Sequence, residues 1–135
     1  MTDGNGVPLA TVLTGANRHD VTQLIELVDR IPSLQGPCGR PRCRPGYLFA
    51  DCAYDSNEHR DALRDRGITP IIPHRQRVHG SGLGVFRWVV ERSIAWLHRF
   101  RRLRIRYERR DDIHEGFLAL ACSLVCWQAI VRSLC

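Results

Sequence analysis

The 135-residue sequence contains no lysine, so each of its 20 basic side chains is an arginine. Its 14 acidic residues leave a formal net charge of +6. The planar, permanently charged fork of arginine matches phosphate groups better than the point charge of lysine does. The basic balance therefore favours a nucleic acid over a membrane as the partner. A GC-rich genome is an alternative reason for the absence of lysine, but it does not explain where the arginines lie.

The sequence also has no apolar run at its N-terminus, no internal repeat and no low-complexity tract. We therefore expect no signal peptide and a cytoplasmic protein whose six cysteines are free thiols, not a secreted disulfide scaffold. Cys38 and Cys43 lack a second close pair of metal ligands, so a flexible basic loop is favoured over a zinc site there. The length predicts one domain, residues 1–135, with a sizeable core.

The N-terminal residues predict a β-hairpin whose first strand is truncated. Asn5-Gly6 is a strong signal for a two-residue turn, and residues 7–14 are predicted to form the returning strand. Only residues 1–3 remain for the first strand, which is fewer than a strand normally has. Asp3 is placed at the end of this strand, where an ordinary turn aspartate is the alternative.

Two helices are predicted in the first half of the chain. Residues 20–31 have an apolar helical face, and Asp20 with Gln23 resembles a capping box. Asp55 is predicted to cap a second helix, which should end at Gly67.

Short strands are predicted to alternate with these helices. Residues 47–51 are predicted to form a buried strand that ends in Asp51, and residues 69–73 a strand at a sheet edge because prolines bound it. The stretch 33–46 is rich in proline, glycine and arginine and is predicted to be a surface loop or insertion. Residues 74–84 are predicted to be a polar link. The alternation predicts an α/β fold with a mixed sheet.

The C-terminal part is predicted to form two long helices. Residues 84–110 are predicted to be one amphipathic helix, with Trp88 and Trp96 as packing aromatics more than base-stacking groups. Residues 113–134 are apolar on nearly all sides, which favours a buried packing helix over a transmembrane span because polar residues interrupt the run. The apolar face of the first of these helices is assigned to Phe86, Val89, Val90, Leu97 and Phe100.

A polar stripe on the predicted helix 84–110 contains Arg87, Glu91 and His98, which fall within about 40° of one another at helical spacing. An ordinary i,i+4 ion pair is the alternative for Arg87 and Glu91, and it is compatible with a functional role. Arginines crowd the second half of this helix, where a solvated face is the alternative to a phosphate-binding surface.

Asp3, Asp51 and Glu91 form a candidate set of metal ligands. Ligands of α/β sheets collect at the carboxyl ends of strands, where Asp51 is predicted to lie. Two or three converging carboxylates hold Mg²⁺ or Mn²⁺, and a pair of such ions catalyses phosphodiester chemistry. The spacing alone is not specific, because 14 acidic residues offer many triplets.

Three runs of the sequence give a more specific indication. TDGNGVPLATVLTGANRHD, LFADCAYDS and RWVVERSIAWLHRFRRLRIRYERRDDIHEGFLALACSLVCW together resemble the catalytic part of bacterial insertion-sequence transposases of the DDE type. The resemblance implies a ribonuclease H-like mixed sheet with flanking helices and two long C-terminal helices. Asp3, Asp51 and Glu91 would be the catalytic, metal-binding acids. At the positions of the family signature Tyr, Arg, Glu and Lys, this sequence has Gly84, Arg87, Glu91 and His98, so that arginine and glutamate match.

The resemblance further implies a reaction and its partners. Mg²⁺ or Mn²⁺ would support cleavage of DNA at the terminal inverted repeats of the element and strand transfer into target DNA. We expect a homo-oligomer in the cytoplasm, associated with the nucleoid, and no membrane. A truncated, inactive remnant that binds DNA nonspecifically and a stand-alone ribonuclease H-like nuclease are the alternatives. The residues expected to contact DNA are Arg87, His98, Arg99, Arg101, Arg102, Arg104 and Arg106.

Overall fold

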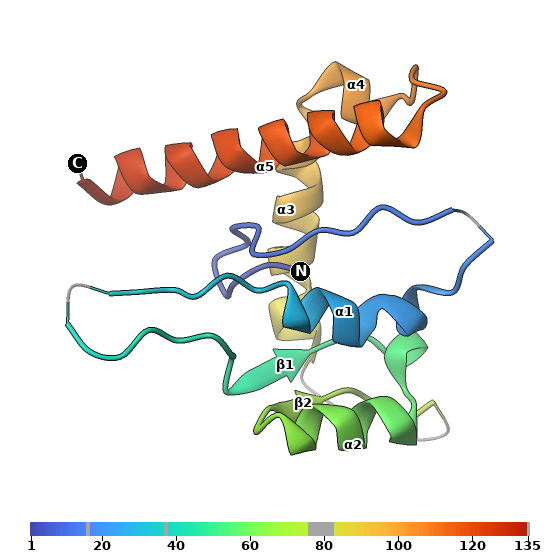
Figure 1. The fold of residues 1–135 in the computed structure, drawn as a ribbon, viewed down its shortest axis with the longest axis vertical. Helices are drawn as coiled ribbons and strands as arrows, with labels where there is room; N and C mark the ends of the chain where they lie inside the picture. Colours follow the sequence, from blue (N-terminus) through green and yellow to red (C-terminus); the bar gives the residue numbers. More distant parts are fainter. Residues whose placement is uncertain (16, 37, 76–82, 135) are drawn as a thin grey trace. The chain divides into compact units, whose positions relative to one another are not determined.

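The computed structural model describes residues 1–15, 17–36, 38–75 and 83–134. It is a mixed α/β structure with a small parallel sheet and several helices (Figure 1). By its internal contacts the chain divides into two compact units. Unit 1 comprises residues 1–13 and 85–135, and unit 2 comprises residues 14–84.

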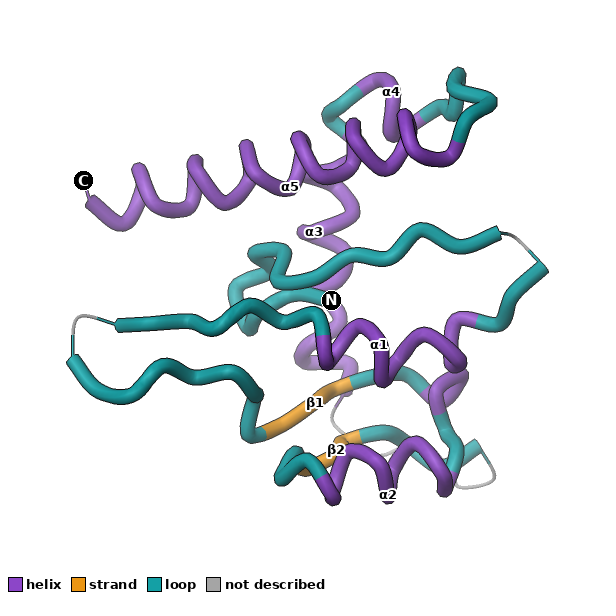
Figure 2. Tube along the Cα trace, in the orientation of Figure 1, coloured by secondary structure: helices purple, strands orange, loops and turns teal. Residues whose placement is uncertain are grey.

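Unit 2 contains the sheet, as the orange segments of Figure 2 show. Strands β1 (Tyr47–Phe49) and β2 (Thr69–Ile71) pair in parallel, with Leu48 opposite Pro70. Helix α2 (Asn57–Asp65) connects them, which gives a β-α-β crossover of the kind that parallel pairing requires. The edge position predicted for the second strand is confirmed, since the described sheet has only these two strands. Both strands end two residues earlier than predicted.

The predicted first helix is present but begins as a 3₁₀ turn, Asp20–Gln23, before α1 (Leu24–Asp29). The predicted capping box is wrong, because His19 occupies the N-cap position and no side chain caps this end. Asp55 is likewise not the cap of α2. Ser56 holds that position, and the Asp55 carboxylate instead binds a guanidinium.

The core of unit 2 is made by apolar side chains of α1, α2 and the segments around β2. Leu63 and Ile68 are completely buried, and Leu24, Val28 and Ile72 are nearly so. The strand predicted to be buried, β1, buries only Leu48, because its other two side chains point to the open face of a two-stranded sheet. Among the described residues of 33–46, Leu34 and Arg42 form an isolated antiparallel bridge. Most of the predicted link 74–84 lies outside the described residues.

Unit 1 begins with a tight turn instead of a hairpin of strands. Thr2 and Pro8 form an isolated antiparallel bridge, and residues 9–14 form no strand. The predicted strand at 7–14 is therefore wrong. Its partner has three residues in this chain, and Pro8 has no N–H with which to continue a ladder.

The long helix predicted at 84–110 is also interrupted. A 3₁₀ turn at Leu83–Phe86 precedes α3 (Arg87–His98), and the short α4 (Arg101–Arg104) follows. Phe100 and Ile105, which flank α4, have extended backbone conformations. A continuous helix would place many of the arginines of this segment three or four positions apart, where like charges repel. The break also turns Phe100 and Leu103 towards the last helix.

The last helix, α5 (Asp111–Leu134), contacts both α3 and α4 (Figure 1). Only Ala121 and Val125 are buried, whereas Trp127 is 63% exposed and Leu134 81%. The prediction of a buried packing helix is therefore wrong: the rest of unit 1 covers only one side of α5. Among the described residues α5 is the one helix long and apolar enough to cross a membrane. The same length and apolar composition also occur in core helices of soluble proteins.

Candidate functional site

Asp3 lies in the N-terminal turn of unit 1. Its Oδ1 atom accepts hydrogen bonds from the backbone N–H groups of Asn5 and Val7, both at 2.8 Å. The turn is completed by a hydrogen bond from Gly6 N to Asp3 O, 3.1 Å long. Asp3 thus stabilises its own turn, which is the ordinary role considered for it, and the hydrogen bonds fix the orientation of its carboxylate.

This turn is attached to α3 at Gly6. The buried Ser93 hydroxyl donates to Gly6 O at 2.8 Å and lies 2.9 Å from Val89 O, an acceptor in its own helix. Gly6 has a φ of +85°, and an added Cβ would lie 3.0 Å from Ser93 Oγ. Only glycine combines this backbone conformation with so close an approach at little cost.

Glu91 lies on α3, where it is exposed and pairs with Arg87. The Nε atom of Arg87 donates to Glu91 Oε1 at 3.0 Å, and the two side chains are 79% and 64% exposed. The i,i+4 ion pair considered for these residues is thus present. Glu91 is two positions from both Val89 and Ser93, which places it on the opposite side of the helix from the turn.

Asp51 lies in unit 2, two residues after the last residue of β1. Its Oδ1 atom accepts a hydrogen bond from Ala53 N at 2.9 Å and so caps the 3₁₀ turn Cys52–Tyr54. Burial, and then the charges of Asp20 and Asp51, raise the pKa of the Tyr54 phenol. The expected position of Asp51 at the carboxyl end of a strand is what the structure shows.

The donor chemistry of Asp3, Asp51 and Glu91 fits a hard divalent cation, because all three are carboxylates. Within the described ranges, each uses one carboxylate oxygen in a hydrogen bond, and the second accepts none. The same part of the chain contains no group of three histidine, cysteine, aspartate or glutamate side chains close enough to hold a metal ion. The acids are thus placed by separate local structures, not gathered into a preformed cluster.

The arginines that follow α3 divide into paired and unpaired groups. Arg102 pairs with Glu108, and Arg106 with Asp111. Elsewhere in the described segment, His98, Arg99, Arg101 and Arg104 have exposed side chains that pair with no carboxylate. The guanidinium of Arg101 instead lies over the ring of Tyr107, at 5.8 Å.

Sequence reasoning missed the role of Arg92. Its guanidinium lies 4.3 Å from the ring centre of Trp88 and 5.8 Å from that of Trp96, so that it forms cation–π contacts with both. Trp88 is 43% exposed and is therefore not the packing aromatic that was predicted. The signal available in the sequence was the spacing of four residues between Trp88, Arg92 and Trp96, because residues four apart are neighbours on a helix.

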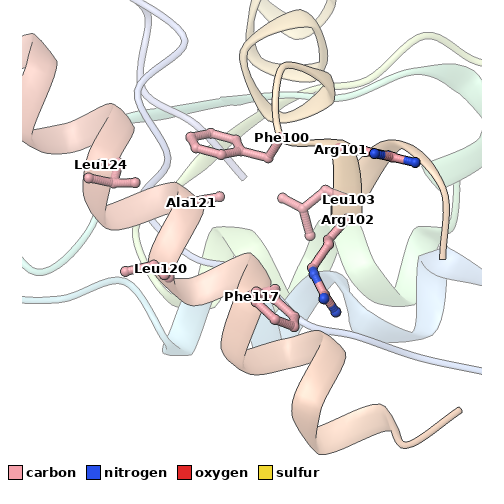
Figure 3. A pocket seen from close by; sticks show the side chains of 8 residues that line it. All are labelled: Phe100, Arg101, Arg102, Leu103, Phe117, Leu120, Ala121 and Leu124. Atoms are coloured by element: carbon pink, nitrogen blue, oxygen red, sulfur yellow. The ribbon is translucent and has the colours of Figure 1, made fainter. Parts of the chain in front are cut away.

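A groove of about 190 Å³ lies between the α3–α4 break and α5. Figure 3 shows Phe100 and Leu103 pointing towards α5, with Phe117 beside Arg102. The Arg102 guanidinium lies 4.9 Å from the Phe117 ring centre. The groove is apolar and none of the three acids lines it, so it is not the candidate metal site. Its lining residues are Phe100, Arg101, Arg102, Leu103, Phe117, Leu120, Ala121 and Leu124.

Comparison with known proteins gives a consistent family. A family model described as Transposase DDE domain matches residues 1–82, and a second model of the same description matches residues 48–128. The first range contains Asp3 and Asp51, and the second contains Asp51 and Glu91. No solved structure matches.

A curated relative agrees with both family models. The putative transposase for insertion sequence element IS402 of Burkholderia cepacia is 60% identical over 133 residues, which cover 98% of this chain. The aligned part is 63% of that protein, so the chain spans less than two thirds of the length of this relative. The chain belongs to the DDE transposases of bacterial insertion sequences.

Proposed function

We propose that this chain is the catalytic region of a transposase that moves an insertion sequence by metal-dependent DNA end cleavage and strand transfer. The observation that carries the proposal is the order Asp3, Asp51, Glu91 within the two matched DDE domain ranges. Each of these acids is held at a turn, a strand end or a helix surface where one carboxylate oxygen stays available.

Asp3, Asp51 and Glu91 would be the ligands of the metal ion, Mg²⁺ or Mn²⁺. Binding one ion would require Glu91 and the Asp3 turn to come together, because they lie on opposite sides of α3 in this structure. When bound, such an ion lowers the pKa of a water molecule and stabilises the leaving oxygen in phosphodiester cleavage. Arg87 orients the Glu91 carboxylate until then. Because this ion pair is exposed, it contributes less than about 1 kcal/mol, so Glu91 can exchange it for a metal ion and Arg87 can turn to a phosphate.

The DNA backbone would bind along the arginines that follow α3. Arg99, Arg101 and Arg104 support this assignment best, because their charges are not neutralised by a carboxylate in the described residues. His98 lies beside them on the exposed end of α3, while Arg87, Arg102 and Arg106 are in exposed ion pairs that a phosphate can replace. The DNA would be the terminal inverted repeats and the target site, and the active form a homo-oligomer in the cytoplasm.

Cleavage of the element's own ends tests this proposal. The substrate is a linear duplex that carries the gene with several hundred bases of flanking DNA, incubated with the purified protein and Mg²⁺, Mn²⁺ or a chelator. We expect metal-dependent cuts at inverted repeats. Asp51→Asn and Glu91→Gln should each slow cutting by at least about 100-fold, the order for losing one group that stabilises the transition state.

Matched control variants make the same charge change elsewhere. Asp61→Asn alters an exposed acid of unit 2 that pairs with Arg64 alone among the described residues, and Glu115→Gln alters an exposed acid of α5. Both should cut at the rate of the unaltered protein. Retained cutting in Asp51→Asn or Glu91→Gln would contradict the assignment of these acids.

A further inference from the structure

The turn that carries Asp51 is held from outside by residues of two other segments of unit 2. The first is Arg60 of α2, which is only 6% exposed. Its Nε and Nη2 atoms donate to Asp55 Oδ1 at 3.0 and 2.8 Å, and Nη2 also donates to Ile72 O at 2.6 Å. A guanidinium this deeply buried needs a paired carboxylate. Asp55 is therefore fixed to α2 and to the end of β2 at once.

The second is Arg75, which follows β2. Its backbone N–H donates to Asp55 Oδ2 at 3.0 Å. Its guanidinium donates to Cys52 O from Nε at 3.0 Å and to Ala53 O from Nη2 at 2.8 Å. These two carbonyl groups belong to the turn that Asp51 caps. Arg75 thus clamps the turn at its backbone, while Asp55 anchors Arg75.

Ala53 connects the Arg75 clamp to Asp51. Ala53 accepts the Arg75 guanidinium at its carbonyl oxygen and donates its N–H to Asp51 Oδ1 at 2.9 Å. A loosened Ala53 would release the atom that sets the direction of the Asp51 carboxylate. Asp3 and Glu91 are oriented differently, by the backbone of their own turn and by a neighbour on their own helix.

The surroundings keep Asp55 ionised, as the clamp requires. The hydrogen bond from Arg60, followed by that from the Arg75 backbone, lowers the pKa of Asp55. His74, whose Nδ1 lies 3.5 Å from Asp55 Oδ1, acts in the same direction when protonated.

We propose that Asp55 and Arg75 are positioning residues for Asp51: together they fix the Cys52–Tyr54 turn so that its amide holds the Asp51 carboxylate in the direction that binds metal. This inference rests on the proposed function, in which Asp51 is a metal ligand. Residues that hold a ligand in place change metal affinity or activity by about 10–100-fold when they are removed.

Arg75→Ala is the best single test, because the Arg75 side chain is exposed and Arg60 still anchors Asp55 when it is lost. The probe is Mn²⁺, titrated into the full chain and followed by the electron paramagnetic resonance of the free ion. We expect the Kd to rise about 10–100-fold with no change in the melting temperature. Arg75→Lys, which keeps one donor, should recover part of the affinity. Arg64→Ala is the matched control, because within the described part of the chain the side chain of this exposed arginine donates only to Asp61.

A second measurement does not depend on metal. The ¹⁵N order parameters of residues 52–54 in the metal-free protein should fall from the value of rigid backbone, about 0.85, towards 0.6 in Arg75→Ala and stay unchanged in Arg64→Ala. Asp55→Asn should have the same effect where it folds. Unchanged order parameters in Arg75→Ala would overturn the clamp.

Asp51→Asn separates the two proposals. If Asp51→Asn abolishes Mn²⁺ binding and Arg75→Ala leaves the Kd unchanged, the positioning role is overturned while the proposed function stands. If Asp51→Asn leaves Mn²⁺ binding unchanged, the metal-ligand role fails and the positioning inference falls with it, whatever the order parameters show. Loss of affinity in both variants, with lower order parameters in Arg75→Ala, supports both.

Discussion

Replacing Gly6 by alanine tests how the turn with Asp3 is attached to α3. The φ of +85° costs an L-residue about 1–2 kcal/mol. The new methyl group would also meet Ser93 Oγ at 3.0 Å and Val89 O at 3.2 Å. Displacing the Ser93 hydroxyl from its buried hydrogen bond to Gly6 O costs about 1 kcal/mol more. We therefore expect Gly6→Ala to lower the free energy of unfolding by about 2–3 kcal/mol.

Urea unfolding followed by tryptophan fluorescence measures this loss, because all three tryptophans lie on α3 and α5 of unit 1. Gly4→Ala is the matched control: it lies in the same turn, has no positive φ, and an added Cβ there meets nothing within 4 Å. Its effect should stay within about 0.5 kcal/mol.

Two further variants separate the cost of the positive φ from the cost of disturbing the contact with Ser93. Gly6→Asn keeps the crowding but tolerates a positive φ better than alanine does, so it should cost less than Gly6→Ala and more than Gly4→Ala. In a Ser93→Ala background, Gly6→Ala should cost about 1 kcal/mol less, because the hydrogen bond is already gone. Equal losses for Gly6→Ala and Gly4→Ala would refute the contact between this turn and α3.

Four other predictions concern separate parts of the chain. Leu63→Ala removes a completely buried side chain and should cost about 2–5 kcal/mol in far-UV circular dichroism melts of unit 2; a loss below about 1 kcal/mol would contradict the described core. Arg104→Gln should reduce the slope of log K against log salt for duplex DNA by about 0.9, measured by fluorescence anisotropy, and an unchanged slope would remove this residue from the interface. Burial raises the pKa of the Cys126 thiol, so iodoacetamide should modify it more slowly than the exposed Cys38 in a mass-spectrometric time course. The pKa of Asp55 is lowered in the folded protein. The Asp55 carboxylate therefore stabilises the fold fully above the pKa of the unfolded state, near 4, and this stabilisation is lost as the pH falls through the lower folded value. Asp55→Asn should flatten the acid end of the curve of stability against pH.

The elements that the sequence predicted well are those set by local signals. Gly67 has a φ of +73° and ends α2 where expected, and the apolar face of α1 buries Leu24 and Val28. Helical periodicity failed at Phe100, because periodicity does not register repulsion between arginines or the packing of Phe100 against α5. It failed again for α5, where composition indicated an apolar helix but carried no information about which sides would be covered.

The candidate site shows the same division. The positions of Asp3, Asp51 and Glu91 in a turn, after a strand and on a helix were predictable from neighbouring residues. The spacing of Asp55 to Glu58 fits a capping box and so predicts a helix cap. Its true partners, Arg60 and Arg75, are contacts made through the folded crossover. A spacing rule cannot anticipate a partner that the tertiary structure brings close.

The division into two units has a consequence for folding during synthesis. Unit 2 is continuous in the chain, so it can form as soon as residues 14–84 have left the ribosome. Unit 1 joins residues 1–13 to residues beyond 84, and closing a flexible loop of that length costs about 4 kcal/mol of chain entropy. Prior folding of unit 2 lowers this barrier by replacing the loop with a compact body. We therefore expect the turn around Asp51 to reach its native structure first. The turn with Asp3 gains its contact with α3 only after α3 has been synthesised.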